Sequence, residues 1–493
     1  MEARKLPGVD DGYGTDSVES RVREYITRCY AEITVGQHIP LSAPLVALVD
    51  RIEVKGHSKS EAFPDSTRYS LCDSNLEIAV YELHATEDVN THDIAQDPDC
   101  ASLPMPFSLC HLPNQAFDGY WEALVYSEPV GEHMLRVLTG AIRKFHNQPT
   151  VFIQNAWYNT VLLSGPPGSG KTSLAQALAQ RLSIRVSDIF PNSILVQVDG
   201  SGVFSHMYGG TAKEIGSLFT KIGQLACDDS DDTRLVVVLV DEIDKLVPCR
   251  KSVGKKNEPL DTMRATAEVL TGLDKLRKTL NVVWLFTTNL PEDLDPAFVD
   301  RCRLKEHVHA PAANCVYDIL RADINAKLRC GEILVGSAPR DGLGEIIGDC
   351  TTNGTSENGV PLCAAVDDDN IPSLVWAGKC SPPAEGTAAA TLQCIAANAC
   401  GLSGRNLRGL LDVALFTYFV DETPSLSDAL VALERVVQKE ARQAGSGRGK
   451  SVEMMAQRKL VGQDGDGELP TSNHGACSRP PLPIDTNVYS SDY

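Results

Sequence analysis

The segment from Gly165 to Thr172 constrains the fold of this chain more than any other feature. It follows the apolar run Val161–Leu163 and leads into a helical pattern of apolar residues, so we expect a strand, a phosphate-binding loop and a helix in that order. The loop residues are Gly165, Pro166, Pro167, Gly168, Ser169, Gly170, Lys171 and Thr172. Glycines allow the backbone amides to turn toward phosphate oxygens. The sequence therefore predicts a nucleotide site in an α/β fold with a parallel sheet.

Charged and hydroxyl side chains indicate how the nucleotide is bound and cleaved. Lys171 can supply charge to the β- and γ-phosphate oxygens, and the hydroxyl of Thr172 is a predicted Mg²⁺ ligand. The run Leu235–Val240 is apolar throughout, as in a strand covered on both faces, and it ends in Asp241 and Glu242. We expect Asp241 to bind Mg²⁺ and Glu242 to deprotonate the water that attacks the γ-phosphate. ATP and Mg²⁺ are the predicted cofactors.

An amide and several arginines extend the predicted site. A third strand-like run, Asn281–Thr287, leads to Asn289, whose amide could help fix the attacking water. Arg301 follows at a position where ring-forming ATPases have an arginine finger that reaches a neighbouring subunit, with Arg303 as the alternative. Arg405 opens a later helix-like run and is predicted to contact the same nucleotide from a lid domain; an ordinary exposed arginine is the alternative.

These parts together resemble an AAA+ ATPase, and finer matches resemble the pachytene checkpoint protein 2 family, whose vertebrate member is thyroid receptor-interacting protein 13. The matching segments are Phe117–Tyr126, Ala297–Arg301 and Gly401–Arg405. Similarity extends from about Cys110 to Arg321 and again from Gly401 to about Lys439. The resemblance implies an AAA+ P-loop fold with a parallel-sheet core, a helical lid subdomain and a small α+β amino-terminal domain.

The same resemblance implies a function. Members of this family are homohexamers that hydrolyse ATP and convert HORMA-domain proteins, with or without a HORMA adaptor, from their closed to their open form. They act in meiotic recombination, chromosome-axis control and the spindle checkpoint. We therefore expect this chain in the nucleus and cytoplasm, associated with chromosomes in meiosis.

The segment Phe204–Gly210 is predicted to contact the substrate. Met207 and Tyr208 lie where AAA+ rings have the loop that grips a chain in the central pore, and their side chains offer apolar contact that tolerates many sequences. The family usually has two bulky aromatic residues at this place, so Met207 is a departure. Packing under the sheet edge is the alternative for Tyr208 and the better interpretation for Phe204.

Composition limits the class of partner and the compartment. The 493 residues carry a formal net charge of −20, which disfavours a wide basic surface, so nucleic acid is not expected as the direct substrate. Fifteen cysteines without a Cys-x-x-Cys pair are typical of reduced intracellular thiols. No run approaches the roughly 18 apolar residues of a membrane span, so no membrane partner is expected.

Composition shifts suggest the boundaries of the domains. The predicted segments are a disordered start (1–16), an amino-terminal domain for substrate or adaptor (17–86), a linker (87–111), a large AAA+ subdomain (112–310), a helical lid (311–444) with a flexible insert (336–390), and a disordered tail (445–493). In the amino-terminal domain we expect a helix around Val22–Cys29 and strands around 45–52 and 76–81.

Two other functions stay open at this point. The chain could be a general AAA+ unfoldase, or a scaffold that ATP regulates and in which hydrolysis only times the release of partners. Glu242 favours an enzyme, because a binding switch has no chemical need for a carboxylate that activates water.

Overall fold

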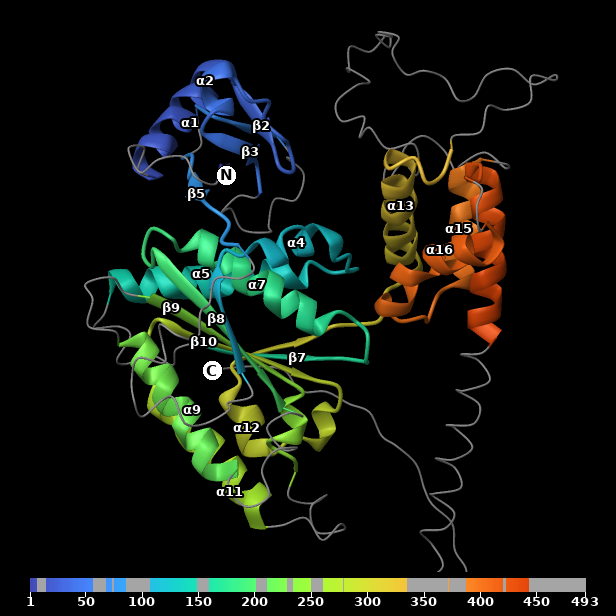
Figure 1. Ribbon diagram of the computed structural model, residues 1–493. Coiled ribbons are helices and arrows are strands. Elements are labelled where there is room, and N and C mark those ends of the chain that lie inside the picture. The colour runs from blue at the N-terminus through green and yellow to red at the C-terminus, as the bar shows by residue number, and fades with distance from the viewer. Residues whose placement is uncertain are drawn as a thin grey trace, which may run out of the picture. The chain divides into compact units, whose positions relative to one another are not determined.

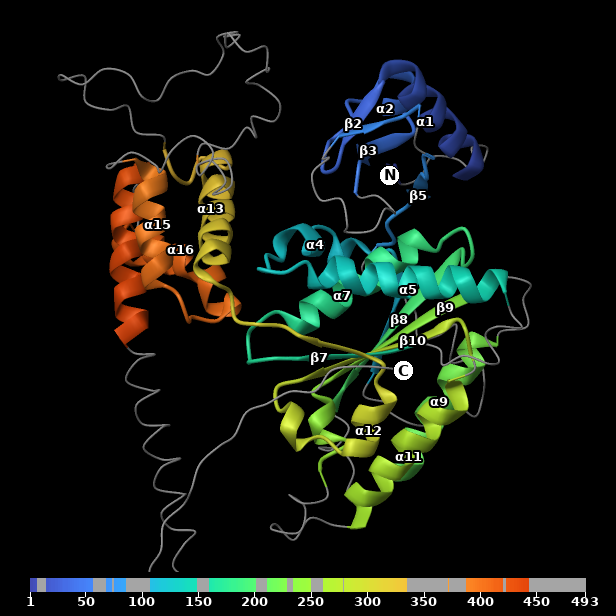
Figure 2. The same ribbon diagram turned by 180° about the vertical axis from the view of Figure 1, so that it is seen from behind.

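The computed structural model describes residues 1–6, 15–55, 68–72, 75–85, 107–148, 159–200, 211–227, 234–249, 260–277, 279–334, 371, 387–419 and 423–442. They form an amino-terminal domain, a large α/β subdomain and a helical lid, which Figures 1 and 2 show from opposite sides. The amino-terminal domain and the lid each have one cluster of buried apolar side chains, and the large subdomain has two. No helix among these residues is long and apolar enough to span a bilayer.

The large subdomain is built on a six-stranded sheet with the order β11-β7-β10-β9-β8-β6. Its strands are β6 Phe107–Leu112, β7 Thr160–Ser164, β8 Asn192–Asp199, β9 Arg234–Asp241, β10 Val282–Thr288 and β11 Leu304–His307. Neighbouring strands are parallel, except that β6 runs antiparallel to β8. The predicted α/β fold with a parallel-sheet core is confirmed.

Helices cover both faces of this sheet (Figure 1). One face carries α5 Val130–Asn147 and α7 Lys171–Arg185, and the other carries α9 Thr211–Ala226, α11 Leu260–Leu276 and α12 Pro296–Arg301. Alternate residues of β9 enter the two cores: Leu235, Val237 and Leu239 on the side of α7, and Val236, Val238 and Val240 on the side of α11. Because both faces are covered, the whole strand is apolar.

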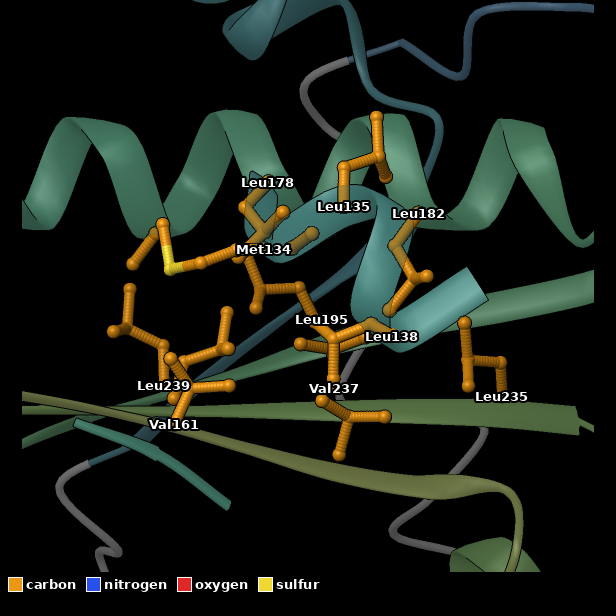
Figure 3. Close-up of a cluster of buried hydrophobic side chains, with 14 of the residues drawn as sticks. Met134, Leu135, Leu138, Val161, Leu178, Leu182, Leu195, Leu235, Val237 and Leu239 are labelled. Carbon is orange, nitrogen blue, oxygen red and sulfur yellow. The ribbon is translucent and has the colours of Figure 1, made fainter. Parts of the chain in front are cut away.

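The core under α5 and α7 consists mainly of aliphatic side chains (Figure 3). Met134 and Leu138 of α5 and Leu178 and Leu182 of α7 lie between the helices and Val237 of β9. Burying each such side chain contributes about 1.5–3 kcal/mol. This packing fixes α7 on the sheet, and with it the loop from which the helix begins.

The amino-terminal domain contains a three-stranded sheet, β3-β1-β5, and a two-stranded ribbon, β2-β4. Its elements are β1 Glu2–Lys5, α1 Thr15–Cys29, β2 Glu32–Thr34, α2 Ala43–Val46, β3 Val49–Glu53, β4 Arg68–Ser70 and β5 Ala79–Tyr81. The helix α1 buries Val18, Val22 and Ile26. The prediction of a strand over 45–52 is wrong for its first half. Residues 43–46 form the short helix α2, with Pro44 in its first turn, and the strand begins only at Val49.

The predicted disordered start over residues 1–16 is wrong at both of its described ends. Residues 2–5 form β1, which pairs antiparallel with β3 and parallel with β5, and α1 already begins at Thr15. The sequence of β1 is mostly charged, yet the side chains of Ala3 and Glu2 are 0% and 3% exposed. Because β1 lies between two strands, backbone hydrogen bonds on both of its edges hold it in place. The amino-acid composition of the segment does not reveal this pairing.

The predicted linker over 87–111 is wrong at its end. Residues 107–112 form β6, which pairs with β8 along its whole length. Phe107 and Leu109 pack against the core on one face and Leu112 is buried in the other, so the segment completes the edge of the sheet. Short elements connect β6 to α5, namely the 3-10 turn Gln115–Phe117 and α4 Tyr120–Ala123.

The lid consists of α13 Ala313–Arg329, α15 Ala388–Asn398, α16 Gly404–Tyr418 and a helix over residues 426–442. It extends into the predicted insert over 336–390, because α15 begins at Ala388 and Ile371 is buried in the lid core. Asn325 binds both backbone groups of Ile371 at 3.2 Å, which explains how this isolated position is held. The rest of the insert and the tail over 445–493 lie outside the described residues.

Candidate nucleotide site

The phosphate-binding loop joins β7 to α7, as the sequence predicts. Gly165 and Gly168 have φ angles of 150° and 74°. A Cβ atom at Gly165 would lie 2.2 Å from the carbonyl oxygen of Val308, and one at Gly168 would lie 2.8 Å from the side chain of Ser403. Both positions therefore require glycine.

Lys171 is buried, with 7% of the residue exposed, and its ammonium group lies within the loop. Its Nζ atom donates to the carbonyl oxygens of Gly165 at 3.0 Å and Pro166 at 2.8 Å. A third hydrogen bond, of 2.7 Å, goes to Oδ1 of Asn289, which follows β10. The structure thus brings Asn289 to the lysine that is predicted to bind the γ-phosphate.

Charges around the loop act on Lys171 in opposite directions. Burial lowers the pKa of its ammonium group, and the charge of Arg405 acts in the same direction. The carboxylates of Asp241 and Asp244 raise this pKa. An anion bound in the loop would add a further negative charge here and favour the charged lysine.

Thr172 and Asp241 meet at the start of α7. The hydroxyl of Thr172 donates to Oδ1 and Oδ2 of Asp241 at 3.1 and 3.0 Å. Thr287 of β10 also donates its hydroxyl to Asp241, and it accepts the backbone N–H of Glu242 at 3.2 Å. Sequence analysis missed Thr287. The alignment of β10 with β9 explains the contact. Phe286 pairs with Val240, so the next residues of the two strands, Thr287 and Asp241, lie side by side.

The donor set fits the predicted cofactors. Hydroxyl and carboxylate oxygens, as on Thr172 and Asp241, are the ligands that Mg²⁺ prefers. The hydroxyl of Ser169 in the loop is buried and has no hydrogen-bond partner in the described part of the chain. A buried hydroxyl without a partner is rare in a folded protein, and a phosphate oxygen would satisfy it.

Glu242 is held in an unusual backbone conformation directly after β9. Its φ angle is 53°, the one positive φ angle of a non-glycine residue among the described residues. Residues with such angles occur often at functional sites. Gly200, which follows β8, makes room for this turn, because a Cβ atom there would lie 2.7 Å from the carbonyl oxygens of both Asp241 and Glu242. Gly200 was also missed in the sequence.

The lid contributes to the loop through α16. The backbone N–H of Arg405 donates to the carbonyl oxygen of Gly168 at 3.3 Å, and Ser403 accepts from the N–H of Asn406 at the start of the helix. Arg405 therefore lies at the nucleotide loop, where the sequence analysis expects it. Its role in binding stays a prediction.

Arg301 lies at the opposite end of the sheet. Its carbonyl oxygen accepts the hydroxyl of Thr160 at 2.7 Å, and the N–H of Arg303 donates to the same hydroxyl at 3.3 Å. Thr160 is the first residue of β7, whereas the phosphate-binding loop follows Ser164, the last residue of that strand. A strand rises about 3.3 Å per residue, so the two ends lie about 13 Å apart. The structure does not bring Arg301 to the nucleotide loop of its own subunit.

A largely apolar cavity lies beside the loop and was not foreseen from the sequence. Trp121, Leu124, Tyr126, Val130 and Leu174 line it. Tyr126 donates its hydroxyl to the carbonyl oxygen of Gly170 at 3.4 Å, and burial raises its pKa, which keeps the hydroxyl protonated. The predicted pore-loop residues Met207 and Tyr208 lie outside the described residues, as does Phe204, for which packing was expected.

Comparison with known proteins agrees with this site. Residues 161–311 match the family model described as ATPase family associated with various cellular activities (AAA). The phosphate loop, the strand order and this match define the class: the chain is an AAA ATPase, and the predicted ATP hydrolysis is confirmed at the level of the family.

The particular family follows from similarity over most of the chain. Identity to the pachytene checkpoint protein 2 homolog of Oryza sativa subsp. indica is 32% over 371 residues, or 75% of this chain and 72% of that protein. For the homolog of Danio rerio it is 32% over 335 residues, or 68% and 71%. The chain spans 53% of the Arabidopsis thaliana homolog, at 36% identity. The chain belongs to the pachytene checkpoint protein 2 family.

A solved structure extends the match to three dimensions. The structure of Caenorhabditis elegans PCH-2 superposes with a TM-score of 0.64 at 25% identity, and the alignment covers 89% of this chain and 98% of that chain. The family predicted from the short motifs is thereby confirmed.

Proposed function

We propose that this protein is a homohexamer that uses ATP hydrolysis to convert HORMA-domain proteins from their closed to their open form. Membership of the pachytene checkpoint protein 2 family supports this substrate class. We place its work in meiotic recombination, chromosome-axis control and the spindle checkpoint, on chromosomes and elsewhere in the nucleus and cytoplasm. HORMA-domain proteins are its partners, with or without a HORMA adaptor.

The observation that carries the proposal is a set of hydrogen bonds between the phosphate-binding loop and the carboxyl ends of strands β9 and β10. Lys171 contacts Asn289, and Thr172 contacts Asp241. These contacts gather, at one edge of the sheet, the groups that bind phosphate and the groups that follow the central strands. An ATPase requires this arrangement because phosphoryl transfer depends on positioning and on charge stabilisation.

Each group then has a chemical task. The loop amides and Lys171 bind the β- and γ-phosphates, and Thr172 and Asp241 would hold Mg²⁺, which would supply positive charge to the phosphate oxygens. Glu242 accepts a proton from the attacking water, and Asn289 orients that water. Arg405 binds the nucleotide from the lid.

The force on the substrate comes from the pore loop. Tyr208 and Met207 grip the HORMA chain as nucleotide turns over, while the amino-terminal domain holds the substrate or its adaptor. Met207 and Tyr208 lie outside the described part of the chain. The assignment therefore rests on their place in the sequence, shortly after β8.

The experiment is a conversion assay with a purified HORMA protein in its closed form. Wild-type protein with ATP should produce the open form, which chromatography separates from the closed form. Tyr208→Ala should keep most ATPase activity and lose conversion, whereas Glu242→Gln should lose both. Normal conversion by a folded Tyr208→Ala ring would rule out the grip. An active wild-type ATPase that never converts HORMA proteins would favour a scaffold or another substrate.

A further inference from the structure

We propose that Asp274 is a positioning residue for Arg301, which it holds so that two guanidinium N–H groups stay available for the γ-phosphate of a neighbouring subunit. The proposal rests on the proposed function, in which Arg301 completes the adjacent nucleotide site. It assigns a role to a residue of α11 that the sequence analysis did not single out.

Asp274 binds one edge of the guanidinium with both of its oxygens. Nε of Arg301 donates to Oδ1 at 3.0 Å and Nη2 donates to Oδ2 at 2.8 Å. Nη1 donates to the carbonyl oxygen of Ala297 at 2.8 Å, one turn earlier in α12. A guanidinium has five N–H donors, so one N–H on each of the two terminal nitrogens has no acceptor among the described residues. A phosphate group can accept from both.

The element that carries Asp274 is fixed on the core. Leu273 beside it is buried, and α11 lies very close to α9 at Gly272, where a Cβ atom would be 2.3 Å from the ring of Phe219. Such close packing leaves the helix little freedom to shift. The carboxylate of Asp274 is therefore presented from a rigid position.

The backbone of Arg301 is equally well held. Asp295 caps α12 by accepting the N–H of Ala297 at 2.8 Å, and Phe298 is completely buried under the helix. Thr160 binds the carbonyl oxygen of Arg301. With the backbone fixed, the remaining freedom of the arginine lies in its side chain, and Asp274 removes much of it.

Stabilising the fold is not a sufficient reason for this ion pair. The side chains of Arg301 and Asp274 are 32% and 50% exposed, and ion pairs in such positions contribute little to stability. Orienting a catalytic group contributes much more, because a displacement of about 1 Å can lower a rate by about 10²-fold. The geometry is thus better explained by catalysis in the ring than by folding of the subunit.

The first experiment compares ATP hydrolysis by assembled rings. Asp274→Ala should lower kcat by about 10- to 100-fold with little change in KM, because nucleotide binding uses the other end of the sheet. Asp274→Asn, which keeps one acceptor oxygen, should be intermediate. Asp300→Asn is the matched control: Asp300 is exposed and its negative charge acts on Arg301 as that of Asp274 does, but it makes no hydrogen bond to Arg301 among the described contacts. Its kcat should be normal.

The second experiment tests which subunit needs Asp274. In rings that combine Lys171→Ala and Arg301→Ala subunits, the Lys171→Ala subunit supplies the working finger. Adding Asp274→Ala to that subunit should lower the restored hydrolysis by the same factor of about 10 to 100. Adding it to the Arg301→Ala subunit should leave hydrolysis unchanged. A merely structural defect would lower activity in both combinations.

Three results would overturn the proposal. Normal kcat in Asp274→Ala rings, beside an inactive Arg301→Ala ring, would remove the positioning role alone. A raised kcat in Asp274→Ala rings would mean that Asp274 keeps Arg301 away from the neighbouring subunit's nucleotide. Full activity of the Arg301→Ala ring would remove both this proposal and the finger assignment, so the two failures are distinguishable.

Discussion

The two ends of strand β7 carry different groups of predicted ATPase residues. After Ser164, at the carboxyl end, the loop residues bind side chains that follow β9 and β10. At the amino end, Thr160 binds the backbone of Arg301, whose side chain contacts Asp274. The first end has the groups predicted to bind the phosphates and to activate water. The second has Arg301, the predicted arginine finger, about 13 Å away along the strand.

In the proposed function this difference makes a single subunit an incomplete enzyme, because the arginine finger comes from its neighbour. If the ends act together, the carboxyl end of one subunit must face the amino end of the next. Binding of nucleotide should then depend on one end alone, whereas turnover should depend on both. The predictions below separate these two quantities.

The largest effect is expected at the amino end. Arg301→Ala should lower ATP turnover by roughly 10³- to 10⁵-fold, because the finger stabilises charge in the transition state. ATP affinity, measured with a fluorescent nucleotide, should be close to normal. Arg303→Ala is the matched control, since Arg303 binds the same Thr160 hydroxyl through its backbone. If Arg303→Ala loses turnover and Arg301→Ala does not, Arg303 is the finger.

A smaller loss is expected at the carboxyl end. Glu242→Gln should lower turnover by about 10²- to 10⁴-fold, because an amide cannot accept the proton of the attacking water. ATP should stay bound, and phosphate release should be measured on the same sample. Glu292→Gln, which changes an exposed carboxylate after β10, is the control and should hydrolyse normally. Near-normal release by Glu242→Gln would remove this residue from the mechanism.

The smallest effects compare two threonines. Thr287→Val removes the hydroxyl that donates to Asp241 and accepts from Glu242, at a cost of about 1–3 kcal/mol for groups left unpaired. The Mg²⁺ concentration needed for half-maximal ATPase activity should rise. Thr160→Val, at the other end of the sheet, should lower kcat without that rise. A shifted Mg²⁺ requirement in both variants would show that the two ends are not independent.

The comparison also shows what the sequence can and cannot reveal. The loop and its flanking strand and helix are contiguous, so glycine spacing and apolar patterns were enough to predict them. The same holds for Asp241 and Glu242, which directly follow an apolar strand.

Contacts between distant segments could not be read in this way. Thr287 and Asp241 are 46 positions apart, and Asp274 and Arg301 are 27 apart. Each pair is set by strand register or helix packing, which no local pattern encodes. The strand at residues 2–5 was missed for the same reason, because its pairing partners lie beyond residue 48.

The central claim is that the two ends of β7 act across subunits, and mixed rings test it most directly. Lys171→Ala and Arg301→Ala subunits, with different tags, are assembled together and purified through both tags. Random assembly at equal amounts gives about a quarter of interfaces an intact loop facing an intact arginine. We expect ATP hydrolysis near that fraction of the wild-type rate, although each variant alone is inactive. Mixed rings as inactive as the two parents would contradict the account.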